Sequence, residues 1–245
     1  MGGVFQYAVI SDIHSNLEAL RAVLEDIDRR DIERILFLGD VVGYGPDPGE
    51  CINLVKKRCL HSVAGNHDWA VIGYTPTDYF NYNARIAIEW TRDQLSDEDL
   101  EFLQSLSIVK VMDSESLFLV HASPRQPDAW NYILTLYDAE VNFQYFKERI
   151  CLIGHSHVPF IIERLPSGEI VIHRDEIALK DSCRYIINVG SVGQPRDGNP
   201  KAAYGIITDE SARIVRVGYD ISSTQEKMRR AGLPEFLIER LEKGM

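Results

Sequence analysis

The opening third of the chain alternates short apolar runs with polar, glycine-rich loops. The first run, residues 5–10, is continuously apolar and predicts a strand buried on both faces. Apolar residues at helical spacing follow it, over 17–27. Two more short runs, 35–38 and 61–64, predict strands, with a helix expected between them over 51–57. This repeat of strand, loop and helix predicts a parallel sheet with crossover helices.

The remainder of the chain is richer in strands. Helices are expected over 83–95 and 96–106. Ser96 and the acidic residues that follow it are typical of a helix N-terminus and predict the start of the second. The other expected helices are 140–147 and 234–242, and the expected strands are 108–112, 117–120, 150–153, 160–163, 169–173, 185–189, 204–208 and 213–219. No repeat, linker or low-complexity segment divides the chain, so a single domain over residues 1–245 is expected.

Charge and cysteine content narrow the class of protein. A net charge of −11 repels nucleic-acid backbones, so no binding of that partner is expected. The four cysteines form no CxxC pair, which favours small buried side chains in a reducing compartment. The start of the sequence has no basic signal region, Gln6 stands where myristoylation needs Ser or Thr, and no apolar run reaches membrane-spanning length. A cytoplasmic protein without a membrane partner is expected.

Five loops carry the candidate chemistry. Each follows a predicted strand, and they are Asp12-x-His14, Gly39-Asp40, Gly65-Asn66-His67-Asp68, His121 and Gly154-His155-Ser156-His157. Because ligands of parallel α/β sheets bind beyond the carboxyl ends of the strands, these loops are expected to meet in one crevice. They hold five of the seven histidines, and the other two, His61 and His173, are interpreted as structural.

The residue types in these loops suit a pair of divalent cations. Carboxylate and amide oxygens with imidazole nitrogens accept Mn, Fe or Zn, and one aspartate can bridge two ions because its oxygens point in different directions. Asp12, Asp40 and a bridging hydroxide would leave net positive charge to attract a phosphate oxygen and to lower the pKa of the bridging water. The alternative is that each loop is a turn, a cap or a hydrogen-bonded histidine, which fits any one of them alone.

In order and spacing, the five loops resemble the calcineurin-like metallophosphoesterase superfamily. GDVVGYGPDP at 39–48 and NVGSVGQPRDGNP at 188–200 resemble segments of its smaller bacterial and archaeal phosphodiesterase-like members. The resemblance covers nearly the whole chain. It implies an α/β fold of two packed mixed β-sheets flanked by helices, a four-layer αββα arrangement.

The resemblance also implies a role for each residue. Asp12, His14, Asp40 and His157 would hold one metal, and Asp40, Asn66, His121 and His155 the other, with Asp40 bridging. His67 would be the general acid that protonates the leaving alkoxide. Asp68 would orient His67 or a neighbour by a hydrogen bond, or would simply cap the helix that follows.

The second motif departs from one branch of the superfamily. Protein Ser/Thr phosphatases carry Gly-Asp-x-Val-Asp-Arg-Gly there, and in this chain Gly43 and Tyr44 replace the Asp and the Arg. In that branch the Arg grips the phosphate and the Asp supports the catalytic His, so phosphoprotein activity is not expected here. The change also counts against symmetrical dinucleoside tetraphosphatases, which share the Arg. Ala122 follows His121 where Gly is commoner, which leaves the ligand in place.

Substrate contacts are less defined. Arg125 and Arg196 lie just past motifs and would hold a substrate phosphate bidentately, unless they are surface ion pairs. The aromatic stretch from Trp69 to Tyr82 would stack a flat group, or would pack the core of the following helices.

Taken together, these residues predict a metal-dependent hydrolase of small phosphoesters, either diesters or monoesters. The alternatives are a nucleotide-directed phosphatase, such as a dinucleoside polyphosphate hydrolase, a non-catalytic scaffold of the same fold and a metal-dependent sensor. The scaffold is disfavoured because every expected ligand and His67 are present.

Overall fold

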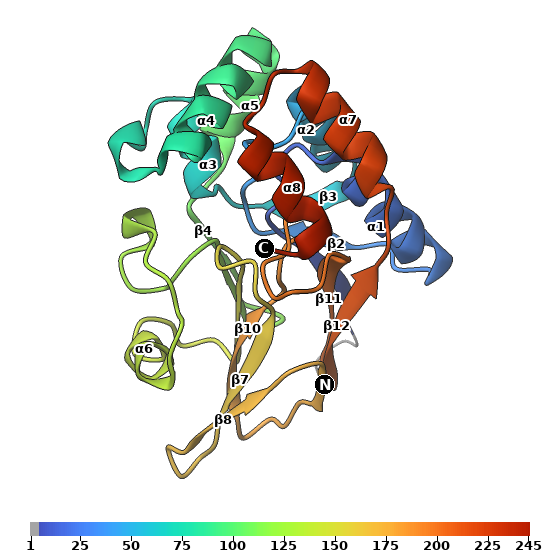
Figure 1. Cartoon of the computed structure of the whole chain (residues 1–245). Helices are drawn as coiled ribbons and strands as arrows, with labels where there is room; N and C mark the ends of the chain where they lie inside the picture. Colours follow the sequence, from blue (N-terminus) through green and yellow to red (C-terminus); the bar gives the residue numbers. More distant parts are fainter. Residues whose placement is uncertain (1–4) are drawn as a thin grey trace.

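The computed structural model describes residues 5–245, without the side chain of Tyr79. Two six-stranded sheets form its centre (Figure 1). The first has the order β3 (Cys59–Ser62), β2 (Ile35–Phe37), β1 (Gln6–Ile10), β11 (Ala202–Thr208), β12 (Ser211–Val217) and β9 (Glu176–Ala178). The second has the order β4 (Val109–Met112), β5 (Leu117–Val120), β6 (Ile150–Ile153), β10 (Arg184–Asn188), β7 (Phe160–Arg164) and β8 (Ile170–His173).

Both sheets are mixed, with a parallel part that delivers the site loops. β1, β2 and β3 run parallel in the first sheet, and β5, β6 and β10 run parallel in the second. β11 and β12 of the first sheet and β4, β7 and β8 of the second pair antiparallel. The predicted run of parallel strands with crossover helices is therefore confirmed for the opening third of the chain.

β1 shows why its apolar run is continuous. Tyr7 and Val9 face the second sheet, where they pack with Leu119, Leu152 and other buried side chains. Ala8 and Ile10 face the helices on the other side. Because successive strand residues point to opposite faces, a strand covered on both sides needs apolar residues at every position.

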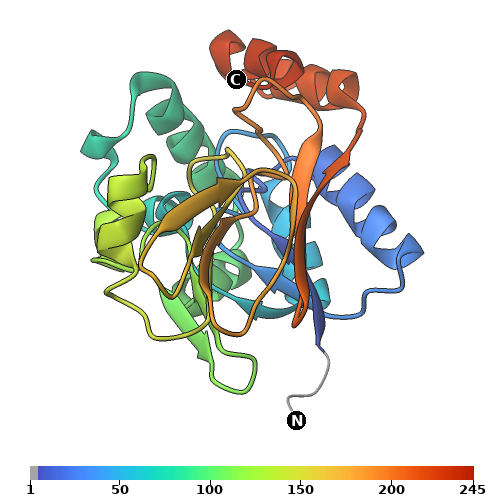
Figure 2. The same cartoon turned by 90° about the horizontal axis from the view of Figure 1, so that it is seen from below.

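Helices cover the two outer faces. They are α1 (Leu17–Arg29), α2 (Pro48–Arg58), α3 (Asn66–Val71), α4 (Tyr82–Gln94), α5 (Asp97–Ser105), α6 (Leu136–Asn142), α7 (Ile221–Arg230) and α8 (Glu235–Lys243), with short 3-10 turns at η1 (Thr77–Tyr79) and η2 (Pro127–Ala129). α1 packs on the first sheet and α6 on the second, and Figure 2 shows them on opposite sides of the paired sheets. The expected fold of two packed mixed sheets flanked by helices is confirmed.

Several predicted boundaries were wrong for local reasons. The helix expected over 140–147 is α6, which begins earlier because Thr135 and Asp138 form a capping box. The strand expected over 61–64 begins at Cys59, and only Val63 continues it, by a single bridge to Ser107. Helix α7, which Asp220 caps through the Ser223 N–H, was not predicted. Within residues 5–245, no helix combines the length and the apolar character needed to cross a bilayer.

Candidate metal centre

The five predicted loops meet at one end of the two sheets. They follow β1, β2, β3, β5 and β6, and seven side chains from them are buried together: Asp12, His14, Asp40, Asn66, His121, His155 and His157. The convergence requires glycine in the loops, since a Cβ on Gly65 would collide with Asp40, and one on Gly154 would collide with Ser11 and Asp12. Five of the seven residues have a positive φ, namely Asp12, His14, Asp40, His155 and His157. Non-glycine residues persist in that region only where the surroundings enforce it, as at functional sites.

Each of the four histidines among these seven residues forms a hydrogen bond from one ring nitrogen to a main-chain carbonyl oxygen. The Nδ1 atoms of His14, His121 and His157 lie 3.0, 2.7 and 2.6 Å from the carbonyl oxygens of Val42, Leu38 and Gln194. His155 uses its Nε2, 2.9 Å from the Trp130 carbonyl. A carbonyl only accepts, so these nitrogens carry the proton, and the other nitrogen of each ring is turned into the site. Outer contacts of this kind orient metal-binding histidines.

One group of atoms is repulsive unless a cation lies among them. The Nε2 atoms of His14 and His157 are 3.1 Å apart, and the Nε2 of His157 is 3.2 Å from Asp12 Oδ1. Burial lowers the pKa of both rings, so both are neutral at neutral pH. With their protons on main-chain carbonyls, both Nε2 atoms present lone pairs to each other and to a carboxylate. The donor set of two imidazoles and a carboxylate suits a transition metal or zinc.

Asp12 and Asp40 each divide their two oxygens between the main chain and the site. Asp12 Oδ2 accepts the N–H of His155, at 3.0 Å, and Asp40 Oδ1 accepts the N–H of His67, at 2.8 Å. Asp40 Oδ2 is left to face His14 Nε2, at 3.6 Å, and His121 Nε2, at 3.3 Å. The two Asp40 oxygens thus point in different directions, and Oδ2 alone faces donors from both expected ligand groups.

Three sets of donors lie close enough to hold an ion among residues 5–245. They are Asp12 with His14 and His157, His14 with Asp40 and His67, and Asp40 with His121 and His155, with the donor atoms of each set within 4.8 Å of one another. The first and third sets each contain three of the four residues expected for one ion, and they share no residue. Asp40 Oδ2 of the third set lies 3.6 Å from His14 Nε2 of the first. Asn66, expected in the second group, has a buried Oδ1 without a hydrogen-bond partner in the described structure.

His67 lies beside the donors in an aromatic cage. Its ring packs against Tyr44, at 4.5 Å between centroids, Phe80, at 5.0 Å, and His14, at 4.8 Å. Its Nδ1 is buried without a hydrogen-bond partner in the described structure. A Cβ at Gly43 would lie 2.5 Å from that Nδ1, so the glycine makes room for the ring. Burial lowers the pKa of His67 to about 4.

Asp68 binds main-chain groups of the site loops and does not contact the His67 ring through a hydrogen bond in the described structure. Its Oδ2 accepts the N–H groups of Asp40, at 2.8 Å, and Gly65, at 2.9 Å, and its Oδ1 accepts those of Val41 and Val42. It is thus both the cap of α3 and the brace of the Asp40 loop, and the described structure gives it no hydrogen bond to the His67 ring. Burial, followed by the charge of Asp40, raises the pKa of Asp68 to about 7.

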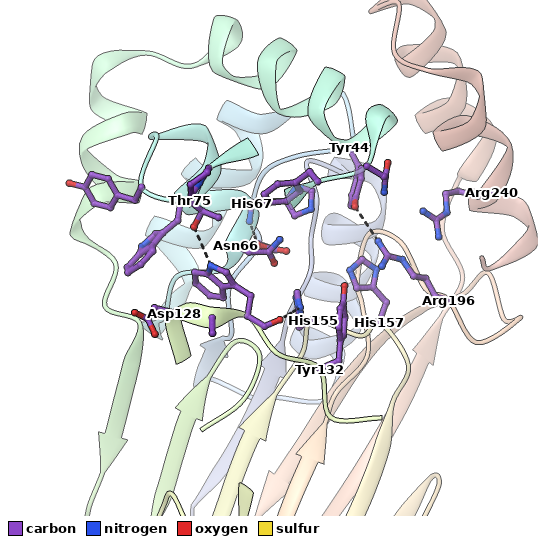
Figure 3. Close-up of a pocket in the computed structure, with 18 of the residues that line it drawn as sticks. Tyr44, Asn66, His67, Thr75, Asp128, Tyr132, His155, His157, Arg196 and Arg240 are labelled. Carbon is purple, nitrogen blue, oxygen red and sulfur yellow. Dashed lines mark hydrogen bonds between the residues drawn. The ribbon is translucent and has the colours of Figure 1, made fainter. Parts of the chain in front are cut away.

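A cavity of about 880 Å³ opens above these residues. Figure 3 shows Thr75 and Asp128 at one end, His67 and His155 in the middle, and Arg196 and Arg240 at the other end. Trp130 belongs to the Thr75 end, because its Nε1 donates to Thr75 Oγ1 at 3.1 Å. Trp69 meets Trp130 edge to face, with ring centroids 5.4 Å apart. We call the side chains of Trp69, Tyr74, Thr75 and Trp130 the aromatic end, and those of Arg196 and Arg240 the arginine end.

The predicted substrate contacts divide between two places. Arg196 lines the cavity, whereas Arg125 lies exposed in a second hollow with Gln126 and Tyr137, 5.8 Å from the Tyr145 ring. Of the aromatic stretch, Trp69, Tyr74 and Phe80 line the cavity, and Trp69 and Phe80 also pack on the core. The packing prediction is thus confirmed for these two side chains, and the stacking of a flat group stays a prediction. Tyr82 is exposed, and the side chain of Tyr79 lies outside the described residues.

Several cavity residues were missed from the sequence. Trp130, Tyr132 and Arg240 belong to no motif, and nothing in their spacing relates them to the site. Tyr132 stacks on His155 at 4.1 Å between centroids, and Trp130 accepts the His155 proton with its carbonyl. Gln126 and Trp130 have positive φ angles, but these angles exist only in the folded chain and could not have been predicted from the sequence.

Comparisons with known proteins agree with this geometry. A model described as the calcineurin-like phosphoesterase superfamily domain matches residues 5–211. An uncharacterised protein of Methanocaldococcus jannaschii is 45% identical over 96% of both chains. The crystal structure of a metallophosphoesterase from Sphaerobacter thermophilus is 44% identical, with a TM-score of 0.86 over 98% of this chain and 99% of that one. A phosphodiesterase of Escherichia coli, YfcE, is 24% identical over 84% of this chain and 88% of its own length.

Proposed function

Because the chain belongs to the calcineurin-like phosphoesterase superfamily, we propose that it hydrolyses small phosphoesters with the help of two divalent cations. Asp12, His14, Asp40 and His157 hold one ion, and Asp40, Asn66, His121 and His155 hold the other. The observation that carries this proposal is the contact of the His14 and His157 Nε2 atoms, 3.1 Å apart with both protons committed elsewhere. When bound, the cations supply a hydroxide nucleophile at neutral pH and positive charge for the phosphate oxygens.

His67 is proposed to protonate the leaving oxygen. The ring reaches the cavity between Tyr44 and Phe80, and its Nδ1 has no hydrogen-bond partner among the described residues. With a pKa near 4, it is neutral in the free protein at neutral pH. A phosphate dianion in the cavity would raise that pKa, because a nearby opposite charge favours the charged imidazolium. The substrate phosphate thus offsets part of the effect of burial and of the cations on this ring, and His67 in its protonated form would give the proton to the departing oxygen.

The remaining site residues are proposed to position these groups. Asp68 holds the Asp40 and Gly65 loops at a fixed separation through four main-chain N–H groups. Arg196 binds the phosphate from the side of Tyr44, whose hydroxyl lies 3.4 Å from its guanidinium. A guanidinium therefore stands beside Tyr44, the residue found where protein phosphatases carry their arginine. Arg125 remains a predicted contact outside this cavity.

A nucleotide-directed phosphatase is the second candidate. The aromatic end offers Trp69 and Trp130 for a flat group next to the metal centre. A symmetrical bis(5'-nucleosyl)-tetraphosphatase of Coxiella burnetii is 29% identical over 74% of this chain, although that match covers 60% of the tetraphosphatase. Both observations favour nucleotides among the small phosphoesters, whereas Tyr44 in place of the arginine counts against a symmetrical tetraphosphatase itself.

The test is a screen of the protein reconstituted with Mn, Fe or Zn. The panel contains nitrophenyl mono- and diesters, cyclic nucleotides, dinucleoside polyphosphates and a folded phosphoserine protein. We expect metal-dependent hydrolysis of at least one small ester and none of the phosphoprotein. A protein that binds two equivalents of metal and hydrolyses none of the esters would be a scaffold or a sensor, and efficient dephosphorylation of the protein would contradict the branch assignment.

A further inference from the structure

Two guanidinium groups lie at one end of the cavity without an acidic side chain as partner. Arg196 comes from the loop after β10 and Arg240 from α8, and both are partly buried and line the cavity (Figure 3). Among residues 5–245, neither forms an ion pair with a carboxylate side chain. The acid next to Arg196 in sequence, Asp197, is paired with Arg216 instead.

The contacts that these two arginines do make leave part of their donors unused. Arg196 donates to Gln194 Oε1, at 2.8 Å, and to the Tyr44 hydroxyl, and lies over the Tyr44 ring. Arg240 donates through its Nε to a terminal carboxylate oxygen of Met245, the last residue of the sequence as given, and lies 5.5 Å from the Phe236 ring. In a chain with 37 acidic and 26 basic side chains, carboxylates are abundant elsewhere on the surface. The planar, multiple donors of arginine are suited to phosphate and carboxylate, and both groups retain free donors here.

The two charges also oppose each other. Burial lowers the pKa of Arg240 to about 10, and the charge of Arg196 adds to that effect. Two guanidinium cations this close to each other repel. An anion between them would relieve this repulsion.

The fold holds the two arginines in place. The Gly198 N–H, in the Arg196 loop, donates to the Gly244 carbonyl at the end of α8, at 2.9 Å. Gly244 has a φ of 63°, and a Cβ there would lie 2.7 Å from main-chain atoms of Asn199, so the two segments fit only with glycine. Leu237, Ile238 and Leu241 of α8 belong to the same buried cluster as Tyr44. The arginine end is therefore preorganised relative to the metal centre.

We propose that Arg196 and Arg240 form a subsite for a second phosphoryl group, on a substrate whose scissile phosphoryl group lies at the metal centre. The order of the contacts supports this arrangement. Tyr44 packs against His14 and His67, Arg196 lies over Tyr44, and Arg240 lies beyond Arg196. The preferred substrates are thus phosphoesters or anhydrides that carry two phosphoryl groups, such as nucleoside diphosphates. The inference rests on the proposed function and deepens it.

The test compares two ligands that differ by one phosphoryl group. AMP and ADP are measured as competitors of p-nitrophenyl phosphate hydrolysis by the metal-loaded protein, with the free metal concentration held constant. We expect ADP to bind at least about tenfold more tightly than AMP, as charge-assisted hydrogen bonds allow. Arg240→Gln should reduce that ratio to near one, and Arg240→Lys, which keeps the charge, should recover part of it.

Lys243→Gln is the matched control. It removes a positive charge from the same helix, but Lys243 is exposed and paired with Glu239, 3.2 Å away, and does not line the cavity. The ratio of ADP to AMP affinity should be unchanged in this variant. A ratio near one in the wild type, an unchanged ratio in Arg240→Gln, or equal losses for both ligands would each overturn the subsite.

The subsite and the proposed function fail in different ways. If the metal-loaded protein does not hydrolyse p-nitrophenyl phosphate, the hydrolytic proposal is weakened, and the affinities for AMP and ADP are then measured by calorimetry. The same affinity ratio and the same three variants still decide the subsite. Hydrolysis with no preference for ADP would leave the proposed function intact and remove only the subsite.

Discussion

The floor and the ends of the cavity are held in different ways. The floor consists of Asp12, His14, Asp40, Asn66, His67, His121, His155 and His157, all of them buried. Four of the histidines are held by main-chain carbonyls, and both aspartates accept main-chain N–H groups. The aromatic and arginine ends come from α3, from α8 and from the loops around Thr75, Trp130 and Arg196. Most of their side chains are half-buried.

This difference separates chemistry from selection. A floor whose donors are fixed by main-chain carbonyls can hold ions and a nucleophile with little reorganisation. Ends that present aromatic rings and cations with no acidic side-chain partner can take their remaining contacts from a substrate. Trp130 joins the two, since its carbonyl holds His155 while its ring lines the aromatic end. Changes to the floor should therefore affect every substrate, and changes to the ends should affect only some.

The strongest test of the floor is Asp40→Asn. Asp40 Oδ2 faces both donor groups, so the loss of its charge should lower the content of both metals. We expect kcat/KM to fall at least roughly 10³-fold on every substrate, because metal-assisted stabilisation of several kcal/mol is lost. Metal content by mass spectrometry and kinetics on two esters check this. Asp93→Asn, at an exposed position of α4, is the control, and retention of both metals would remove Asp40 from the bridging role.

His67→Ala tests whether the floor separates metal binding from proton transfer. Both metals should stay bound, and the loss of kcat should be roughly 10²–10³-fold on alkyl esters, as general acid catalysis typically contributes. The loss should be much smaller on nitrophenyl esters, whose leaving group needs no proton. His61→Ala, outside the site, is the control. Because the His67 ring also lies within reach of His14 and Asp40, loss of one metal would show that it is a ligand.

Gly43→Ala perturbs the floor without removing any of its functional groups. The new Cβ would lie 2.5 Å from His67 Nδ1, and the φ of 88° disfavours any side chain. We expect roughly a tenfold loss on alkyl esters, and about 1–3 kcal/mol of lost unfolding free energy from the strained backbone. Gly73→Ala has a similar φ of 82° but nothing within 4 Å, so it should lose stability and keep activity. Equal activity in the two variants would mean that Gly43 does not position His67.

The pH dependence of metal binding probes the charge balance of the floor. Burial would lower the pKa of His121, but the charges of Asp40 and Asp12 outweigh it and raise the pKa to about 9. The ring is thus protonated in the metal-free protein at neutral pH and must lose a proton to bind an ion. Apparent metal affinity should rise about tenfold per pH unit from pH 7 to about 9 and then level off.

The raised pKa of His121 makes the stability of the metal-free protein fall as the pH rises, whereas metal affinity rises. A raised pKa stabilises the metal-free protein fully below the ordinary pKa of 6.5, and this contribution is lost as the pH rises through about 9. Calorimetric titration in two buffers of different ionisation enthalpy measures the proton release, and chemical unfolding of the metal-free protein measures the stability. An affinity that stays constant between pH 7 and 8 would show that His121 is already neutral.

The smallest expected effects concern the two predicted arginines. Arg196→Gln should raise KM roughly tenfold, because a charge-assisted contact to phosphate is lost. Arg125→Gln should change KM less than about threefold, because Arg125 lies in the separate hollow beside Tyr145. Steady-state kinetics on one substrate compare the two variants. A larger effect at Arg125 would place the substrate across both hollows.

Local sequence signals accounted for much of the fold and nearly all of the floor. Ser96 and Asp99 form the capping box that marks the start of α5, and the apolar run of β1 is buried on both faces. The same kind of cap at Thr135 was overlooked, and α7 was missed although Asp220 caps it. Helix α7 buries Thr224, Gln225 and Met228 against the rest of the molecule, and two of these three are polar, so few apolar residues mark its buried face in the sequence.

The sequence by itself determined the floor, because each donor follows directly on a strand and parallel strands end at the same edge of a sheet. Only the tertiary structure decided which oxygen of Asp40 faces the donors, that Asp68 braces the Asp40 loop, and that Gly43 makes room for His67. It alone placed Arg240 beside Arg196 and Trp130 beside Trp69. These pairs join segments distant in the chain, and no local spacing records a contact made by the packing of helices and loops.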